Sequence, residues 1–239
     1  MKPKFFALPL LLACGGAYAG SFELSTLQNL SQSEFRQLSE DLGAAVSYKP
    51  LAPADSLGPL GFDVGLAMSA TRLANTAAEQ KAISGSSVFN TLPVPSLRAI
   101  KGLPYNIDVG VEYARIPSSG INLYGAEIKW AFLPGSIALP ALALRGSFTR
   151  LNGISQLGFE TAGVDLSISK GFAFLTPYAG LGQVRSRSAT DGLALSQVNL
   201  TQSKYFAGVD ANLGLGNLVF EADSTGGIHT YSLKAGLRF

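Results

Sequence analysis

The feature that most constrains the fold is an alternation of apolar and polar residues that runs from about Gly61 to the last residue. In the run 62–70, FDVGLAMSA, the even-numbered residues up to Met68 are apolar and the odd-numbered ones are acidic or small. A period of two is that of a β-strand, whose successive side chains point to opposite faces. The pattern recurs in runs separated by Gly, Pro, Asn and Ser clusters. We therefore predict an all-β, antiparallel fold of about ten strands, with eight or twelve as alternatives and 44–48 as a possible extra strand.

A soluble β-sandwich alternates in the same way, so the composition of the two faces has to distinguish it from a membrane barrel. Charged residues make up 14% of the chain, against roughly 25% in ordinary soluble domains. The polar face of the predicted strands carries mostly Gly, Ala, Ser and single charges rather than the Lys, Glu and Thr of a wetted surface. We therefore expect the apolar face to contact lipid and the small and ionic side chains to line a crowded lumen.

The connections between the predicted strands alternate in length. They are short at 102–104, 170–171 and 214–216 and long at 74–91 and 187–202. Outer-membrane barrels have short periplasmic turns and longer outer loops, and the sheet closes because hydrocarbon offers no partner to a free strand edge. Aromatic residues near the strand ends suit two interfacial girdles: Tyr105, Tyr113, Trp130, Phe132, Phe148, Phe172, Phe174, Tyr205, Phe220 and Tyr231.

The last nine residues, YSLKAGLRF, resemble the closing strand of bacterial outer-membrane β-barrels, with alternating apolar residues and a terminal Phe. The run LTPYAGLG at 175–182 is similar to a strand common in small barrels of this class, and the N-terminal extension loosely resembles families near the long-chain fatty-acid transporters. The resemblance implies an up-and-down transmembrane barrel over 61–239, of an uncharacterised family. It also implies that periplasmic chaperones and the barrel-insertion machinery read an assembly signal made of Tyr231, Leu233, Leu237 and Phe239.

The first nineteen residues have the form of a signal peptide for export. A basic MKPK is followed by the apolar FFALPLLLA and by Ala17-Tyr18-Ala19, a small-x-small cleavage site. About a dozen apolar residues are too few to cross a membrane as a helix. A lipoprotein box ending at Cys14 is the alternative; cleavage after Ala19 instead removes the only cysteine, which excludes disulfides and thiol catalysis. Both readings export the chain, and with the predicted barrel they place it in the cell outer membrane.

One helix is predicted before the strands, in an N-terminal extension covering 20–60. Ser31 to Glu34 forms a capping box, Leu30 and Phe35 form the matching hydrophobic staple, and Gly43 is the expected stop. One face of this helix carries Phe35, Leu38 and Leu42. The polar face lacks the Lys and Arg excess of a helix that lies on a membrane surface. We therefore expect a plug inside the lumen or a periplasmic cap.

The polar face of the strands also predicts a lumen charge network. Both signs occur at similar depth, and an unpaired buried charge is costly, so we expect pairs that neutralise one another. Such a network either holds the barrel together or forms a polar constriction for small solutes. Its predicted members are Asp63, Asp108, Glu112, Glu127, Lys129, Arg145, Asp165, Lys204, Asp210, Glu221, Lys234 and Arg238, with Asp223 on the same face.

Signals of catalysis are weak. His229 is the only histidine and lies in a predicted outer loop, with Asp223 and Asp191 as the nearest acids that other loops could bring to it. There is no GxSxG, no phosphate-binding loop and no His/Cys metal cluster. The chain has 18 Lys+Arg and 16 Asp+Glu, and because Lys2 and Lys4 lie in the leader, 16 of each sign remain. We predict no catalytic residue, no metal, no cofactor, no enzymatic activity and no nucleic-acid partner.

The sequence thus predicts an integral outer-membrane barrel that acts as a narrow channel or carrier for a small solute. The alternative is a non-conducting structural or surface-interaction barrel that works through its loops at 74–91 and 187–202. The expected partners are outer-membrane lipid, the chaperones and insertion machinery and, for the channel or carrier, a small solute.

Overall fold

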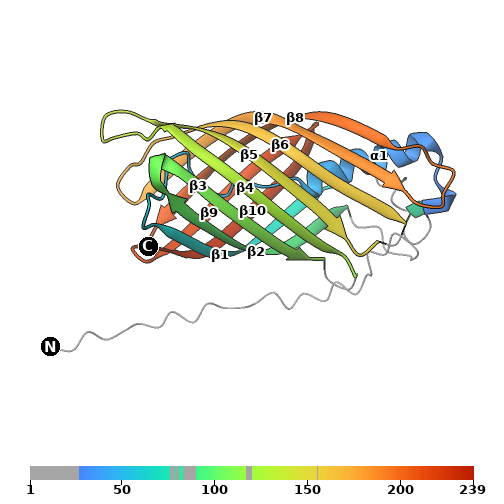
Figure 1. Ribbon diagram of the computed structural model, residues 1–239, viewed down its shortest axis with the longest axis horizontal. Coiled ribbons are helices and arrows are strands. Elements are labelled where there is room, and N and C mark those ends of the chain that lie inside the picture. Colours follow the sequence, from blue (N-terminus) through green and yellow to red (C-terminus); the bar gives the residue numbers. More distant parts are fainter. Residues whose placement is uncertain (1–26, 76–77, 79–80, 83–89, 117–119, 155) are drawn as a thin grey trace.

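The computed structural model describes residues 27–75, 78, 81–82, 90–116, 120–154 and 156–239, so the predicted signal peptide, Cys14 and most of 74–91 lie outside the described residues. Ten antiparallel strands form one closed barrel (Figure 1), which confirms the predicted fold class and strand number. The strands are β1 (Phe62–Arg72), β2 (Thr91–Leu103), β3 (Ile107–Arg115), β4 (Asn122–Leu133), β5 (Ala141–Asn152), β6 (Leu157–Ser169), β7 (Leu175–Thr190), β8 (Val198–Asn212), β9 (Gly216–Thr225) and β10 (Ile228–Arg238).

The barrel closes where β1 pairs with β10. At the start of β1, Phe62 N–H donates to the Phe239 carbonyl at 2.6 Å and Phe239 N–H donates to the Phe62 carbonyl at 3.0 Å. Their rings stack with centroids 6.0 Å apart. The same end of the barrel carries the connections 104–106, 134–140, 170–174 and 213–215, and we call it the turn end. The opposite end is the loop end.

The helix α1 spans Gln32–Val46 and begins with the predicted capping box at Ser31 and Glu34. It does not stop at Gly43, which was the predicted end, but continues to Val46 with Ser47 as its C-cap, so 44–48 is not a strand. Gly43 instead permits close packing, because a Cβ there would lie 2.6 Å from Gln202 Oε1 on β8. Among the described residues, no helix is both long and apolar enough to cross a membrane.

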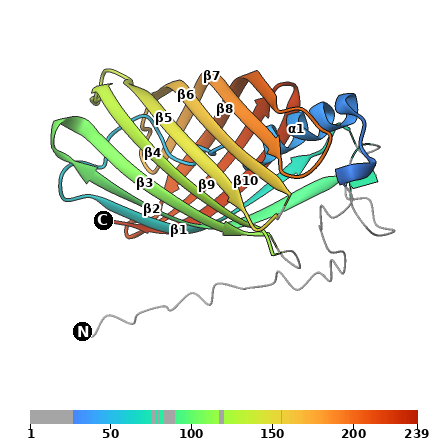
Figure 2. The ribbon, with the colours of Figure 1, turned by 45° about the vertical axis from the view of Figure 1, so that its right-hand side comes forward.

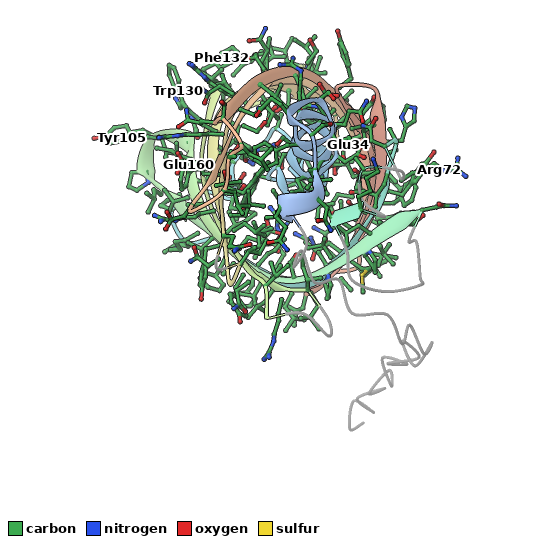
Figure 3. All side chains as sticks on the ribbon, turned by 90° about the vertical axis from the view of Figure 1, so that its right-hand side faces the viewer. Glu34, Arg72, Tyr105, Trp130, Phe132 and Glu160 are labelled. Atoms are coloured by element: carbon green, nitrogen blue, oxygen red, sulfur yellow. The ribbon has the colours of Figure 1, made fainter. Side chains whose placement is uncertain are left out.

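The helix lies inside the barrel at the loop end, as the end-on view in Figure 3 shows. Gln32 at its start exchanges hydrogen bonds with the backbone of Ser196, in the connection between β7 and β8. The residues that follow the helix, 47–61, run along the lumen to the turn end and join β1 (Figure 2); we call them the luminal strap. The helix therefore does not cap the turn end.

The outward face carries an apolar belt between two aromatic girdles. The girdle near the turn end contains Tyr105, Trp130, Phe132, Phe172 and Phe174, and the second girdle contains Tyr113, Tyr124, Phe148, Tyr205 and Tyr231. All ten are exposed, and Phe220 is exposed within the belt between them. Along β4, Tyr124 and Phe132 are eight residue steps apart. At ~3.4 Å per residue and a tilt of about 40°, this is roughly 20 Å of height, close to the apolar band of a membrane barrel.

Beyond the second girdle the amphipathic pattern inverts. We call this part of the wall the collar. Its outward residues are polar: Arg72, Arg115, Arg150, Glu160, Arg185, Arg187, Asn199 and Thr201. Its inward residues are apolar: Leu92, Val94, Leu123, Leu151, Phe159 and Leu200. The region 187–202 was predicted as a loop and is mostly strand, because β7 and β8 continue beyond the belt with water outside and an apolar interior.

Candidate functional site

The helix α1 is held by an apolar seat in the collar. Phe35, Leu38 and Leu42, the predicted apolar face, are at most 2% exposed and belong to one cluster with the inward residues of the collar. Each fully buried side chain of this size contributes about 1.5–3 kcal/mol through the hydrophobic effect. The loop half of the lumen is therefore an apolar core, where the sequence predicted small and ionic residues.

Polar contacts fix the orientation of α1 within this seat. The Asp41 carboxylate accepts hydrogen bonds from the backbone N–H groups of Ala74 at 3.1 Å and Asn75 at 2.7 Å, just after β1. At the other end of the helix, Thr149 Oγ1 on β5 donates to the Val46 carbonyl at 2.9 Å. The helix is thus tied to separate parts of the wall.

Glu34 at the start of α1 pairs with Lys81, which follows β1 in the chain. The hydrogen bond from the Lys81 ammonium, together with those from the Ser31 backbone N–H and hydroxyl, lowers the pKa of Glu34 to about 2. The carboxylate consequently stays ionised and serves both the capping box and the contact with Lys81.

The luminal strap makes its contacts through charges of the wall. The ammonium of Lys49 lies 3.2 Å from Asp223 Oδ1 on β9, and both side chains are at most 3% exposed. Lys204 Nζ on β8 donates to the Tyr48 carbonyl at 2.6 Å. Glu221 accepts from the Leu51 backbone N–H at 2.9 Å. Wall charges therefore satisfy backbone groups of the strap, which is not itself a strand of the sheet.

Arg98 on β2 contacts both the strap and Glu112, although it was not among the predicted lumen charges. Its guanidinium lies 4.4 Å from the centroid of the Tyr48 ring, 3.4 Å from the Pro50 carbonyl and 3.5 Å from Glu112 Oε2. The run LPVPSLRAIKGL is apolar at both parities, so its alternation did not show which side chains point inward. Lys49 was missed as well, because it precedes the first strand.

The turn end of the lumen is closed by a second group of ion pairs. Asp63 accepts from Lys234 at 2.8 Å and from Arg238 at 2.7 Å, and Arg238 also reaches Asp210 at 2.6 Å. Lys129 lies 3.0 Å from Asp108 and donates to the strap carbonyl of Pro53 at 2.9 Å. These contacts tie β1, β3, β4, β8 and β10 to each other and to the strap.

The predicted lumen charges are all placed inside the wall, and eight of them pair with one another: Asp63, Asp108, Glu127, Lys129, Arg145, Asp210, Lys234 and Arg238. The other four have different surroundings. Glu112 pairs with Arg98, Lys204 and Glu221 bind the strap, and Asp165 lies opposite Arg145 in the β5–β6 register. Tyr178, which was not among the predicted residues, donates to Glu221 at 2.8 Å.

The residues predicted for assembly and the lone histidine lie on the outward face. Tyr231, Leu233, Leu237 and Phe239 are between 49% and 65% exposed. His229 is also outward and exposed, whereas Asp223 points into the lumen toward Lys49. The wall therefore separates His229 from one of the two acids suggested for it, and Asp191 follows the end of β7 at the loop end. Within the described residues, no group of three or more His, Cys, Asp or Glu is arranged to hold a metal ion.

The outward face of the barrel shows which solvent surrounds the protein. A closed sheet leaves no strand edge unpaired along the belt, and the belt exposes large apolar side chains such as Ile128 at 54%, Val111 at 60% and Leu237 at 58%. Only hydrocarbon is a suitable solvent for such a surface between two aromatic girdles. The protein is an integral outer-membrane β-barrel. Its interior is a filled lumen.

No family model matches the chain, and no curated protein matches it. Among solved structures, the chain is similar to the N-terminal β-barrel domain of OprF from Pseudomonas aeruginosa (TM-score 0.39, 12% identity, 76% of this chain and 99% of that one). It is also similar to Ail, the attachment invasion locus protein of Yersinia pestis (0.31, 12%, 75% and 97%), and to Neisserial surface protein A (0.31, 13%, 74% and 95%).

Proposed function

We propose that the protein is a sealed, non-conducting outer-membrane barrel that acts as a structural or surface-interaction protein through its collar and loops. The observation that carries this proposal is the occupation of the lumen along its length, by α1 in the apolar collar and by the strap among the wall charges. Short turns face the periplasm in this class of barrel, so the helix lies at the outer mouth. The proposal assigns no catalytic role to any residue.

The filled lumen argues against an open channel. The largest fully buried side chains include Arg98, Arg145, Tyr48, Lys204 and Lys234, all of which lie in the interior. Between the strap and the wall at the turn end, the cavity beside Asp63, Asp108 and Lys129 measures about 10 Å³. A single water molecule needs about this much space, so a solute does not fit.

Conductance across a planar lipid bilayer tests the seal. We expect the purified mature protein to give no steady conductance, because α1 and the strap occupy the lumen. Stable ohmic steps from the wild type that scale with protein inserted would contradict the proposal. Loss of the folded form would be recognised separately, by loss of heat-modifiable migration on a denaturing gel.

Cysteine accessibility gives an independent measure of whether α1 stays seated. Gln37 is exposed and Leu38 is 1% exposed on the same helix. A polar maleimide should label Gln37→Cys quickly in intact membranes and label Leu38→Cys only after unfolding. Equal labelling of the two variants would show that the helix leaves its seat, which the sealed barrel does not allow.

A gated carrier is a second candidate, and the polar nature of the strap contacts favours it. The strap is held by ion pairs and hydrogen bonds such as Lys49–Asp223 and Lys204–Tyr48, which can exchange for water, whereas α1 is held by apolar packing. A variant lacking residues 27–46 distinguishes the two functions. Solute uptake into vesicles by the wild type, raised further in the deletion, would favour the carrier.

A further inference from the structure

The wall of the barrel has a notch in its collar. β9 and β10 are joined at Gly226–Gly227, and the pairing of β8 with β9 ends at Lys204 and Thr225. β8 begins six residues earlier, at Val198, and is paired there only with β7. The hydrogen bond from Gly226 N–H to the Ser203 carbonyl, at 2.9 Å, is the last one on this side. Within the described residues, the edge of β8 from 198 to 202 therefore has no strand partner toward β10.

A polar hollow of about 720 Å³ occupies this notch. Its outer lining comes from β8 and β9 through Thr201, Ser203 and Ser224, and its back wall is formed by Arg36 and Glu40 of α1. The plug helix is thus reached from the side of the barrel through this hollow. Hydroxyl groups and an unpaired strand edge offer hydrogen bonds to a polar group that enters the hollow.

An apolar groove continues from the hollow down the outward face of the barrel. It measures about 300 Å³, with Tyr205 and Tyr231 as its walls and Ala207 and Ala222 between them. Both tyrosines are more than half exposed and belong to the girdle at the outer boundary of the belt. Tyr205 and Ser224 line both the groove and the hollow, so the two form one continuous depression.

The charges around the notch are mainly positive. On the outward face of β7, Arg185 lies opposite Thr201 and Arg187 opposite Asn199. Arg72 follows the Thr71–Thr230 pair at the end of β1, on the other side of the notch, and points outward (Figure 3).

The acidic residues around the notch each lie beside an arginine. Glu160 is 3.7 Å from Arg187, and Glu40 is 3.4 Å from Arg36. Arg36 thus lines the hollow itself, and Arg72, Arg185 and Arg187 add positive charge to the outward surface on either side of it.

We propose that this depression binds one phosphate-bearing lipid of the outer leaflet. The acyl chains occupy the groove between Tyr205 and Tyr231, and the phosphate enters the notch among the arginines and hydroxyl groups. The change from apolar to polar lining coincides with the outer girdle, which is the depth at which a lipid changes from chain to headgroup. An added peptide strand would use the edge of β8 but not the apolar groove. The lipid therefore contacts both the wall and the plug helix.

Native mass spectrometry of the full mature protein, titrated with dimyristoyl phosphatidylglycerol, tests this site. The variant Arg72→Ser/Arg185→Ser should bind the lipid about tenfold more weakly or worse, because each arginine at a membrane surface contributes substantially to anionic lipid binding. The matched control is Arg115→Ser/Arg150→Ser, which removes two outward collar arginines away from the notch and should change binding by no more than about twofold. Dimyristoyl phosphatidylcholine should bind weakly to all three proteins.

A second pair of variants tests the groove without changing charge. Ala222→Phe fills the groove and should reduce lipid binding to the level of the notch variant, whereas Ala126→Phe, at an exposed outward position on β4, should not. Equal effects in the test and control variants would overturn the proposal. A spectrum dominated by dimers that Ala222→Phe dissociates would overturn it too, because the occupant would then be a second copy of the chain. Lipid binding does not depend on whether the lumen conducts.

Discussion

At the scale of single residues, Asp63 makes the ion pairs that join β1 to the closing strand β10. It lies near the start of β1, is 1% exposed, and neutralises Lys234 and Arg238, both on the closing strand β10. Asp63→Asn leaves two cations in the interior with one acidic partner fewer, so we expect a loss of about 3–5 kcal/mol in the free energy of unfolding. The measurement is denaturant unfolding in lipid vesicles, followed by migration of the folded form on a gel.

The control for this prediction is an exposed pair. Glu160 and Arg187 lie 3.7 Å apart with side chains 38% and 57% exposed. Glu160→Gln should change stability by less than about 1 kcal/mol, as is usual for surface salt bridges. Comparable losses in the two variants would show that Asp63 is not a closing residue of the seam.

Glu34 gives a prediction about pH. Its pKa falls from an ordinary value of 4.5 to about 2, mainly through the Lys81 ammonium. A lowered pKa in the folded state means that the ionised carboxylate stabilises the fold fully above pH 4.5, and that this contribution is lost as the pH falls toward 2. NMR of protein with labelled glutamate carboxyl groups should show one resonance that titrates near pH 2. Lys81→Met should move that midpoint upward, and an unchanged midpoint would exclude Lys81 as the cause.

At the scale of elements, α1 is stabilised more by its seat than by its exposed face. Leu38→Ala leaves a cavity in the apolar cluster and should cost about 2–5 kcal/mol in local or global stability. Gln37→Ala, on the exposed face of the same helix, should be close to neutral. Thermal loss of the folded band on a gel and maleimide labelling of a reporter cysteine together separate global unfolding from release of the helix alone. Equal behaviour of the two variants would contradict the seat.

The sequence predicted the strands of the belt and the start of α1, but not the strand ends in the collar or the end of α1. Strands within the belt alternate cleanly because lipid outside and charge inside differ strongly, so runs such as 62–70 were readable. Beyond the belt the two faces exchange polarity, and the outward Arg187 and Asn199 made part of β7 and β8 look like a loop. The capping box at Ser31 is local and was correct, whereas the end at Gly43 was wrong because its packing against Gln202 is a contact between distant segments.

In the candidate site, the sequence predicted which strand residues face the lumen but not their contacts with the strap. Parity placed Asp63 and Lys234 on the same face, but it could not give the path of the strap, whose contacts with Lys204 and Glu221 depend on where residues 47–61 thread through the lumen. Arg98 was hidden because its strand is apolar at both parities. Pairs between strands follow from periodicity, whereas contacts with an irregular segment need the three-dimensional structure.

At the scale of the whole molecule, the barrel has two solvents outside and two kinds of interior. In the belt, an apolar outside surrounds an ionic lumen; in the collar, a polar outside surrounds an apolar core that contains α1. The boundary between the two follows the girdle of Tyr113, Tyr124, Phe148, Tyr205 and Tyr231. The sequence therefore encodes the depth of the protein in the membrane as well as its fold.

A pair of arginine substitutions tests this depth. Ile128 is 54% exposed at the middle of the β4 segment between the girdles, and Asn152 is an exposed outward residue of the collar on β5. Ile128→Arg places a charge near the bilayer midplane and should cost about 2–4 kcal/mol of folding free energy in lipid vesicles, whereas Asn152→Arg should cost less than about 1 kcal/mol. Trp130 is the only tryptophan and faces lipid, so its emission during a guanidinium titration reports insertion in both variants. Equal stability of the two variants would mean that the belt and the collar share one solvent, and the boundary at the second girdle would then be wrong.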